Sequence, residues 1–94
     1  MTLSVDFELF PSGNMIRAAR GLVGLEQAEL AQQVNVTSKT ISSIERDISL
    51  RPDERRTKIV RRIRDHLTGR FGIVFLYEDD GQGEGVRLAR PRSR

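Results

Sequence analysis

Small polar side chains and one lysine gather on one face of a short helical segment, Ser38–Arg46. Ile41 and Ile44 recur at helical spacing and mark its buried side. The side chains left facing outward are Ser38, Lys39, Ser42 and Ser43. Hydroxyl and ammonium groups on an exposed helix can bind base edges in the major groove of duplex DNA. A helical hairpin with a solvated polar face fits the same pattern, so the pattern alone leaves both interpretations open.

A second helical segment, Glu26–Val34, precedes this one, and the tripeptide Asn35-Val36-Thr37 separates the two. Asn35 tolerates a left-handed backbone, and Thr37 is suited to cap the helix that follows. Ala31 is small where the two helices must cross closely, and Val36 is expected to fill the corner between them. The spacing therefore predicts a helix-turn-helix.

The residue inventory argues against other kinds of site. The chain has no cysteine and a single histidine, His66, which excludes disulfides and thiolate or histidine-rich metal sites. Asp79-Asp80-Gly81 lacks the remaining ligands of a calcium loop, and residues 81–85 lack the lysine and helix of a phosphate loop. No nucleophile–base pair stands out, and the chain is too small for a deep active site. We expect neither enzymatic activity nor a cofactor.

The charge distribution favours an anionic partner. The net charge is +3, and the 16 basic residues comprise 14 arginines and two lysines. Residues 1–50 carry four basic and six acidic side chains, whereas residues 51–94 carry twelve and seven. Arginine makes planar, bidentate contacts with phosphate, and nucleic acid is the commonest anionic partner. With four phenylalanines and one tyrosine, a base-stacking platform for single strands is not expected.

The sequence shows no membrane or export signal. No apolar run approaches the ~18 residues that span a bilayer. The N-terminus lacks the basic and apolar regions of a signal peptide. We therefore expect a cytoplasmic protein without a membrane partner.

The rest of the chain predicts further helices and a small amount of β-structure. Apolar and polar residues alternate near the N-terminus, and the apolar run at residues 73–77 has strand composition. The expected elements are a strand over residues 2–9, a helix from Asn14 to Gly24 capped by Ser12 or Asn14, a helix from Asp53 to Thr68 that ends at Gly69 and Gly72, and a hairpin of Ile73–Tyr77 and Val86–Ala89 around a glycine-rich turn.

Basic residues are concentrated around the helix expected over residues 53–68. They surround its apolar stripe rather than forming one patch, so most of them are interpreted as a solvated face. They are Arg51, Arg55, Arg56, Lys58, Arg61, Arg62 and Arg64. Arg46, Arg51 and Arg55 follow the segment Ser38–Arg46 directly, so they are candidates for contacts with flanking phosphates.

Residues 15–46 closely resemble the Cro/CI-type (XRE-type) helix-turn-helix of bacterial and phage regulators. The matching positions are Arg20, Gly24, Leu25, Gln27, Leu30, Ala31, Val36, Thr40, Ile41 and Glu45. The resemblance covers about a third of the chain. It implies a mainly α protein with a small β element: a lambda-repressor-like domain of about four helices, here with an N-terminal strand and a C-terminal β-hairpin.

The resemblance also implies roles for individual residues. Gln27 and Thr37 match positions that touch the DNA backbone, Thr37 serving also as a cap. The matches to base-reading positions are Ser38, Lys39, Thr40 and Ser43. Arg20 and Glu45 match a structural ion pair that ties the first helix to the recognition helix. Two residues depart from the family pattern: Glu26, a weaker cap that would repel a nearby phosphate, and Asn35 in place of the turn glycine.

Taken together, the sequence predicts a homodimeric, sequence-specific regulator that binds a palindromic operator and represses transcription, often its own, with a dual role as activator left open. The expected division is an N-terminal strand extension (1–13), the DNA-binding domain (14–70), a dimerisation hairpin (71–90) and a basic tail (91–94). The strand and hairpin are expected to join one intermolecular sheet. Its interface residues would be Leu3, Val5, Phe7, Val74, Phe75, Leu76, Val86 and Leu88.

Two rival classes of protein are also consistent with the sequence. An antitoxin would use the same fold to bind a toxin protein as well as DNA, but residues 91–94 are short for a toxin-wrapping tail. A purely structural dimerisation module would leave Lys39 and Gln27 without a role. Because no separate ligand domain is evident, control is expected to come through the protein's level or through a regulatory protein partner.

Overall fold

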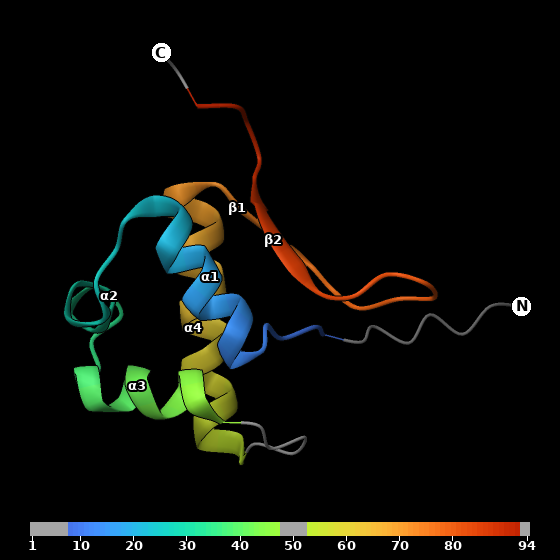
Figure 1. The fold of residues 1–94 in the computed structure, drawn as a ribbon. Coiled ribbons are helices and arrows are strands. Elements are labelled where there is room, and N and C mark those ends of the chain that lie inside the picture. Colours follow the sequence, from blue (N-terminus) through green and yellow to red (C-terminus); the bar gives the residue numbers. More distant parts are fainter. Residues whose placement is uncertain (1–7, 48–52, 93–94) are drawn as a thin grey trace, which may run out of the picture.

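The structure, a computed structural model, describes residues 8–47 and 53–92. Within these residues, four helices precede a two-stranded antiparallel sheet (Figure 1). The elements are α1 (Gly13–Val23), α2 (Gln27–Gln33), α3 (Ser38–Arg46), α4 (Glu54–Phe71), β1 (Ile73–Leu76) and β2 (Gly85–Leu88). The expected fold class, mainly helical with a C-terminal hairpin, is confirmed.

Side-chain caps and glycines fix the ends of the helices. Ser12 caps α1, its Oγ accepting a hydrogen bond from the Met15 N–H at 3.1 Å, and Thr37 caps α3 in the same way. α1 and α4 end at Gly24 and Gly72, where φ is +68° in both cases. This left-handed conformation favours glycine because it has no Cβ.

α4 is longer than the sequence predicts. It ends at Phe71 rather than at Thr68, and Gly69 lies within it. Phe71 packs against the hydrophobic core, so two further helical residues beyond Gly69 bury apolar surface before Gly72 ends the helix. No helix within the described ranges, α4 included, has the length and apolar character needed to cross a membrane.

The core lies where the four helices and the hairpin meet. Val36 packs against it from the α2–α3 turn, where Asn35 has a φ of +61°. The largest fully buried side chains are Ile16, Leu30, Ile41, Ile63, Leu67 and Ile73. Each helix therefore contributes to one continuous core, and so does the first residue of β1.

The hairpin packs against α1 with one face (Figure 1). The register pairs Phe75 with Val86 and Val74 with Arg87, so alternate residues point to opposite faces. Phe75, Val86 and Leu88 are partly buried against the chain's own core. Val74 lies on the outer face with Leu76, and Leu76 is 41% exposed.

The predicted N-terminal strand is wrong for its last two residues, and residues 2–7 lie outside the described part of the chain. Glu8 and Leu9 have no strand structure. Arg61 and Arg64 hold the Glu8 carboxylate at 2.7 and 2.8 Å. The hydrogen bond from Arg61 is the main reason that the pKa of Glu8 falls to about 2. These contacts attach the segment around Glu8 to α4 instead of to the edge of a strand.

Phe10 continues this attachment. Its ring lies under the guanidinium groups of Arg61 and Arg64, 5.5 and 5.4 Å from their carbon atoms to the ring centroid. The Leu9 carbonyl oxygen accepts hydrogen bonds from Arg64, at 3.0 Å, and from the Tyr77 hydroxyl, at 3.4 Å. The residues before α1 therefore bridge α4 and the end of β1.

Candidate nucleic-acid interface

α3 lies at the end of the molecule opposite the C-terminal residues (Figure 1). Its buried side includes Ile41 and Ile44, which are 0% and 4% exposed. The helical period places Lys39, Ser43 and Arg46 together on the opposite side. Lys39 and Arg46 are exposed and Ser43 is half-buried. This stripe combines two cations and a hydroxyl on one accessible helix face.

Ser38 and Thr40 lie on the two flanks of this stripe. Ser38 lines a shallow depression together with Gln27 at the start of α2. Thr40 lines a hollow between α3 and the first turn of α4, and its hydroxyl lies 3.0 Å from that of Thr37. The four predicted base-reading residues therefore do not share one face: Lys39 and Ser43 point outward between the other two.

An ion pair joins α1 to the end of α3. Arg20 holds the Glu45 carboxylate in a bidentate arrangement, with Nε at 2.5 Å from Oε2 and Nη2 at 2.8 Å from Oε1. The Glu45 side chain is 1% exposed and that of Arg20 is 15% exposed. Arg20 also donates to the Leu25 carbonyl oxygen at 2.9 Å, so its guanidinium group fixes the α1–α2 turn as well.

Gln27 donates a further hydrogen bond to the buried carboxylate of Glu45. Its side-chain amide donates to Glu45 Oε1 at 2.9 Å. Burial alone would raise the pKa of Glu45, but the hydrogen bonds from Arg20 and Gln27 and the nearby positive charges outweigh it and lower that pKa. Glu45 therefore stays ionised at neutral pH, and the first residue of α2 is bonded to the last turn of α3.

The basic residues near α3 differ in what they contact. Arg46 and Arg55 are exposed, and Arg46 donates to the Ser42 carbonyl oxygen at 3.3 Å. Arg51 lies outside the described residues. Arg17 is exposed on α1 and donates to the Glu45 carbonyl oxygen at 3.4 Å. This contact of Arg17 was not predicted from the sequence, although Arg17 lies one helical turn before Arg20.

Several of the α4 arginines that were interpreted as a solvated face also make defined contacts with other segments. Arg56 contacts Ser43 and the residue after α3, Arg61 and Arg64 bind Glu8, and Arg62 donates to the Val34 carbonyl oxygen at 2.7 Å. Arg62 thereby satisfies a carbonyl group at the C-terminal end of α2. Helical periodicity could not reveal these partners, because all of them lie on other segments.

The comparison with known families agrees with this geometry. Residues 16–55 match the helix-turn-helix family, a stretch that begins in α1, includes α2 and α3, and ends in the first turn of α4. These residues therefore form a helix-turn-helix of the XRE type. The match supports a DNA-binding transcription regulator. No curated protein and no solved structure matches the chain significantly.

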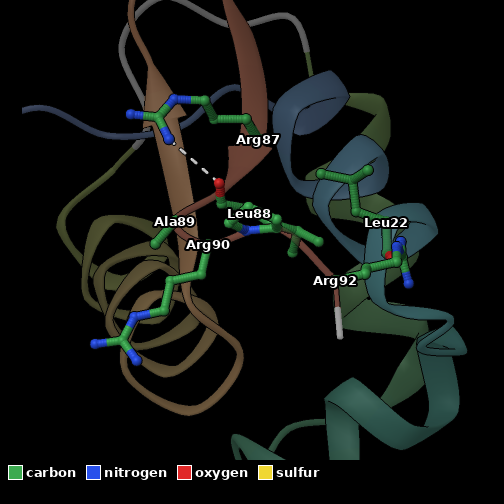
Figure 2. Close-up of a pocket in the computed structure, with 7 residues that line it drawn as sticks. Leu22, Arg87, Leu88, Ala89, Arg90 and Arg92 are labelled. Carbon is green, nitrogen blue, oxygen red and sulfur yellow. Dashed lines mark hydrogen bonds between the residues drawn. The ribbon is translucent and has the colours of Figure 1, made fainter. Parts of the chain in front are cut away.

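The protein has a second concentration of arginines far from α3. Figure 2 shows a hollow beside α1 that is lined by Leu22 and by residues 87–92. Arg92 donates to the Leu22 carbonyl oxygen at 2.5 Å, and Arg87 donates to the Leu88 carbonyl oxygen at 3.2 Å. Arg92, which was expected to belong to the basic tail, therefore contacts α1 through its side chain.

Proposed function

We propose that this regulator is a sequence-specific repressor that binds a palindromic operator as a homodimer. The observation that carries the proposal is the outward stripe on α3, in which Lys39 and Arg46 are exposed and Ser43 is half-buried, opposite the buried side of the helix. An exposed helix of this kind, held rigidly from behind, can enter the major groove. The ion pair of Arg20 with Glu45 supplies that rigidity.

The base-reading role falls mainly on Lys39. Its ammonium group can donate to guanine O6 and N7, the commonest pattern of acceptors read in the major groove. Ser38 and Ser43 can bind neighbouring base edges, and the Thr40 methyl group can contact a thymine methyl group. These contacts would select one sequence in each half-site.

Phosphate contacts would position the helix without selecting sequence. One side-chain N–H of Gln27 donates to Glu45, and the second is available for a phosphate at the start of α2. Arg46 and Arg55 would bind flanking phosphates beside the end of α3, as would Arg51. Thr37, the cap of α3, would contact the backbone at the other end of that helix.

The outer face of the hairpin is the proposed dimer contact. Phe75, Val86 and Leu88 pack against the chain's own core. Among the described residues, the proposed dimer contact is therefore limited to Val74 and Leu76. Leu3, Val5 and Phe7 lie outside the described residues and remain proposed contributors. A two-fold axis at this sheet would place two copies of α3 in successive major grooves, about 34–36 Å apart.

Repression would follow from occlusion of a promoter in the cytoplasm of the bacterial cell. The test is selection of bound duplexes from a random pool, followed by footprinting on DNA upstream of the regulator's own gene. We expect enrichment of a palindrome whose half-sites lie about 10–11 base pairs apart, centre to centre. Equal retention of random and selected duplexes would contradict sequence-specific binding, and an enriched single half-site would contradict the dimer.

A further inference from the structure

Arg56 reaches from α4 to the outward stripe of α3. Its Nη2 donates to the Ser43 hydroxyl oxygen at 3.1 Å, and its Nη1 lies 3.3 Å from Oδ2 of Asp47. The side chains of Arg56 and Asp47 are 29% and 26% exposed. The guanidinium group is thus held between a residue of the proposed reading stripe and the residue that directly follows α3.

The main chain of Arg56 is fixed as well. Asp53 caps α4, and its Oδ1 accepts the Arg56 N–H at 2.7 Å. The cap orients the first turn of α4, while the Asp47 carboxylate attracts the other end of the side chain. Both anchors are independent of DNA, so the contact with Ser43 is organised before any ligand arrives.

This contact decides what Ser43 can offer to a base. A serine hydroxyl has one hydrogen to donate and two lone pairs that accept. In the structure a charged donor occupies one lone pair, so the hydroxyl hydrogen is directed elsewhere. The adjacent positive charge polarises the O–H bond and strengthens it as a donor. The same charge repels the amino hydrogens of cytosine and adenine.

We propose that Arg56 is a specificity-determining residue that makes Ser43 a dedicated donor. This inference rests on the proposed function. Ser43 then selects a base edge that presents an acceptor: purine N7, guanine O6 or thymine O4. It disfavours the amino groups of cytosine and adenine at that position. Arg56 acts through Ser43 and does not itself touch the base.

The test is a comparison of base preference at each operator position for the wild type, Ser43→Ala, Arg56→Gln and the double variant. We expect Ser43→Ala and Arg56→Gln to reduce discrimination at the same single position in each half-site, by roughly fivefold, the lower end of what one good base contact gives. The double variant should lose no more discrimination than Ser43→Ala alone, because both changes remove one interaction.

Two further variants keep the result interpretable. Lys58→Gln removes one positive charge from an exposed position on the same helix and should leave the preference profile unchanged. Arg56→Lys retains the positive charge but lacks the planar guanidinium group with its fixed N–H donors. It should therefore lose part of the discrimination between bases. This milder variant carries the test if Arg56→Gln fails to fold, which thermal melting would reveal.

Other results would overturn the inference. If Arg56→Gln weakened operator and random duplex by the same factor and left every base preference intact, Arg56 would be a phosphate contact. If the losses from Ser43→Ala and Arg56→Gln fell at different positions or simply added, the two residues would act separately. If the wild type enriched no sequence at all, the proposed function would fail and this inference with it.

Discussion

The main chain of Gly13 lies directly against the carbonyl group of Glu45. A Cβ atom at position 13 would lie 2.5 Å from the Glu45 carbonyl oxygen and 2.6 Å from that of Ile44. Backbone atoms cannot move aside as a flexible side chain can. The first residue of α1 therefore touches the last turn of α3, and only glycine permits this approach.

Gly13→Ala is accordingly expected to destabilise the protein. The added methyl group would force α1 away from α3, which should lower the free energy of unfolding by about 1–3 kcal/mol, the usual effect of overpacking. Gly21→Ala is the matched control in the same helix, because nothing lies within 4 Å of a Cβ there. It should raise the free energy of unfolding by roughly 0.5–1 kcal/mol. Urea denaturation of both variants measures the contrast, and equal stabilities would contradict the close approach.

Removing one member of the buried ion pair should be costly. Glu45→Ala leaves the Arg20 charge without its carboxylate, which we expect to lower the free energy of unfolding by about 3–5 kcal/mol. Replacing both partners with apolar residues, as Arg20→Met with Glu45→Leu, should destabilise less than the two single changes together. Thermal melting checks this, and a melting temperature unaffected by Glu45→Ala would contradict it.

The lowered pKa of Glu45 predicts a dependence of stability on pH. A carboxylate whose pKa is lower in the folded state stabilises the protein fully above its unfolded pKa, about 4.3 for glutamate. That contribution is lost as the pH falls from there through the folded pKa. The stability difference between the wild type and Glu45→Gln should thus be largest near neutral pH and shrink below about pH 4. A difference that stayed constant on acidification would argue against an ionised Glu45.

Lys39 and Gln27 should behave differently as DNA contacts. Lys39→Ala is expected to weaken operator binding by about 1–3 kcal/mol and to relax preference at one position per half-site, with a smaller effect on random DNA. Gln27→Ala should weaken all sequences alike, as loss of a phosphate contact does. Because Gln27 also bonds Glu45, this variant should in addition lose roughly 1.5 kcal/mol of folding stability. Binding titrations on operator and random duplexes separate the two roles.

Substitution on the outer face of the hairpin tests the proposed dimer. Leu76→Lys places a charge on the face opposite the core, so it should dissociate the dimer without lowering the stability of the monomer appreciably. Phe75→Ala is the counterpart on the inner face and should reduce folding stability by about 3 kcal/mol or less, since Phe75 is only partly buried. Sedimentation measures the assembly, and a stable Leu76→Lys dimer would place the interface elsewhere.

Deletion of residues 73–94 would test the proposed dimer less well than Leu76→Lys does. Ile73 is 1% exposed and belongs to the core, as do the partly buried residues of the inner hairpin face. Their removal would open the core beside α1, so loss of assembly could not be separated from loss of folding. Substitution on the outer face avoids this difficulty.

The sequence by itself determined the elements that depend on neighbours along the chain. The spacing of Ile41 and Ile44 defined the buried side of α3, and Thr37 defined its first turn. The boundaries of α3 were predicted correctly for the same reason. Helical period, capping and turn conformation are local properties, because the interacting groups lie within about one turn of each other.

Tertiary structure alone decided which distant groups meet. Strand alternation placed Val74 and Phe75 on opposite faces, but packing on α1 decided that Phe75 faces the core. The basic run predicted a solvated helix, yet docking of α4 against α3 brought Arg56 to Ser43. These contacts join side chains from separate elements, and their distances are set by how the elements pack. Sequence periodicity fixes the face on which a residue lies, while only packing fixes what that face meets.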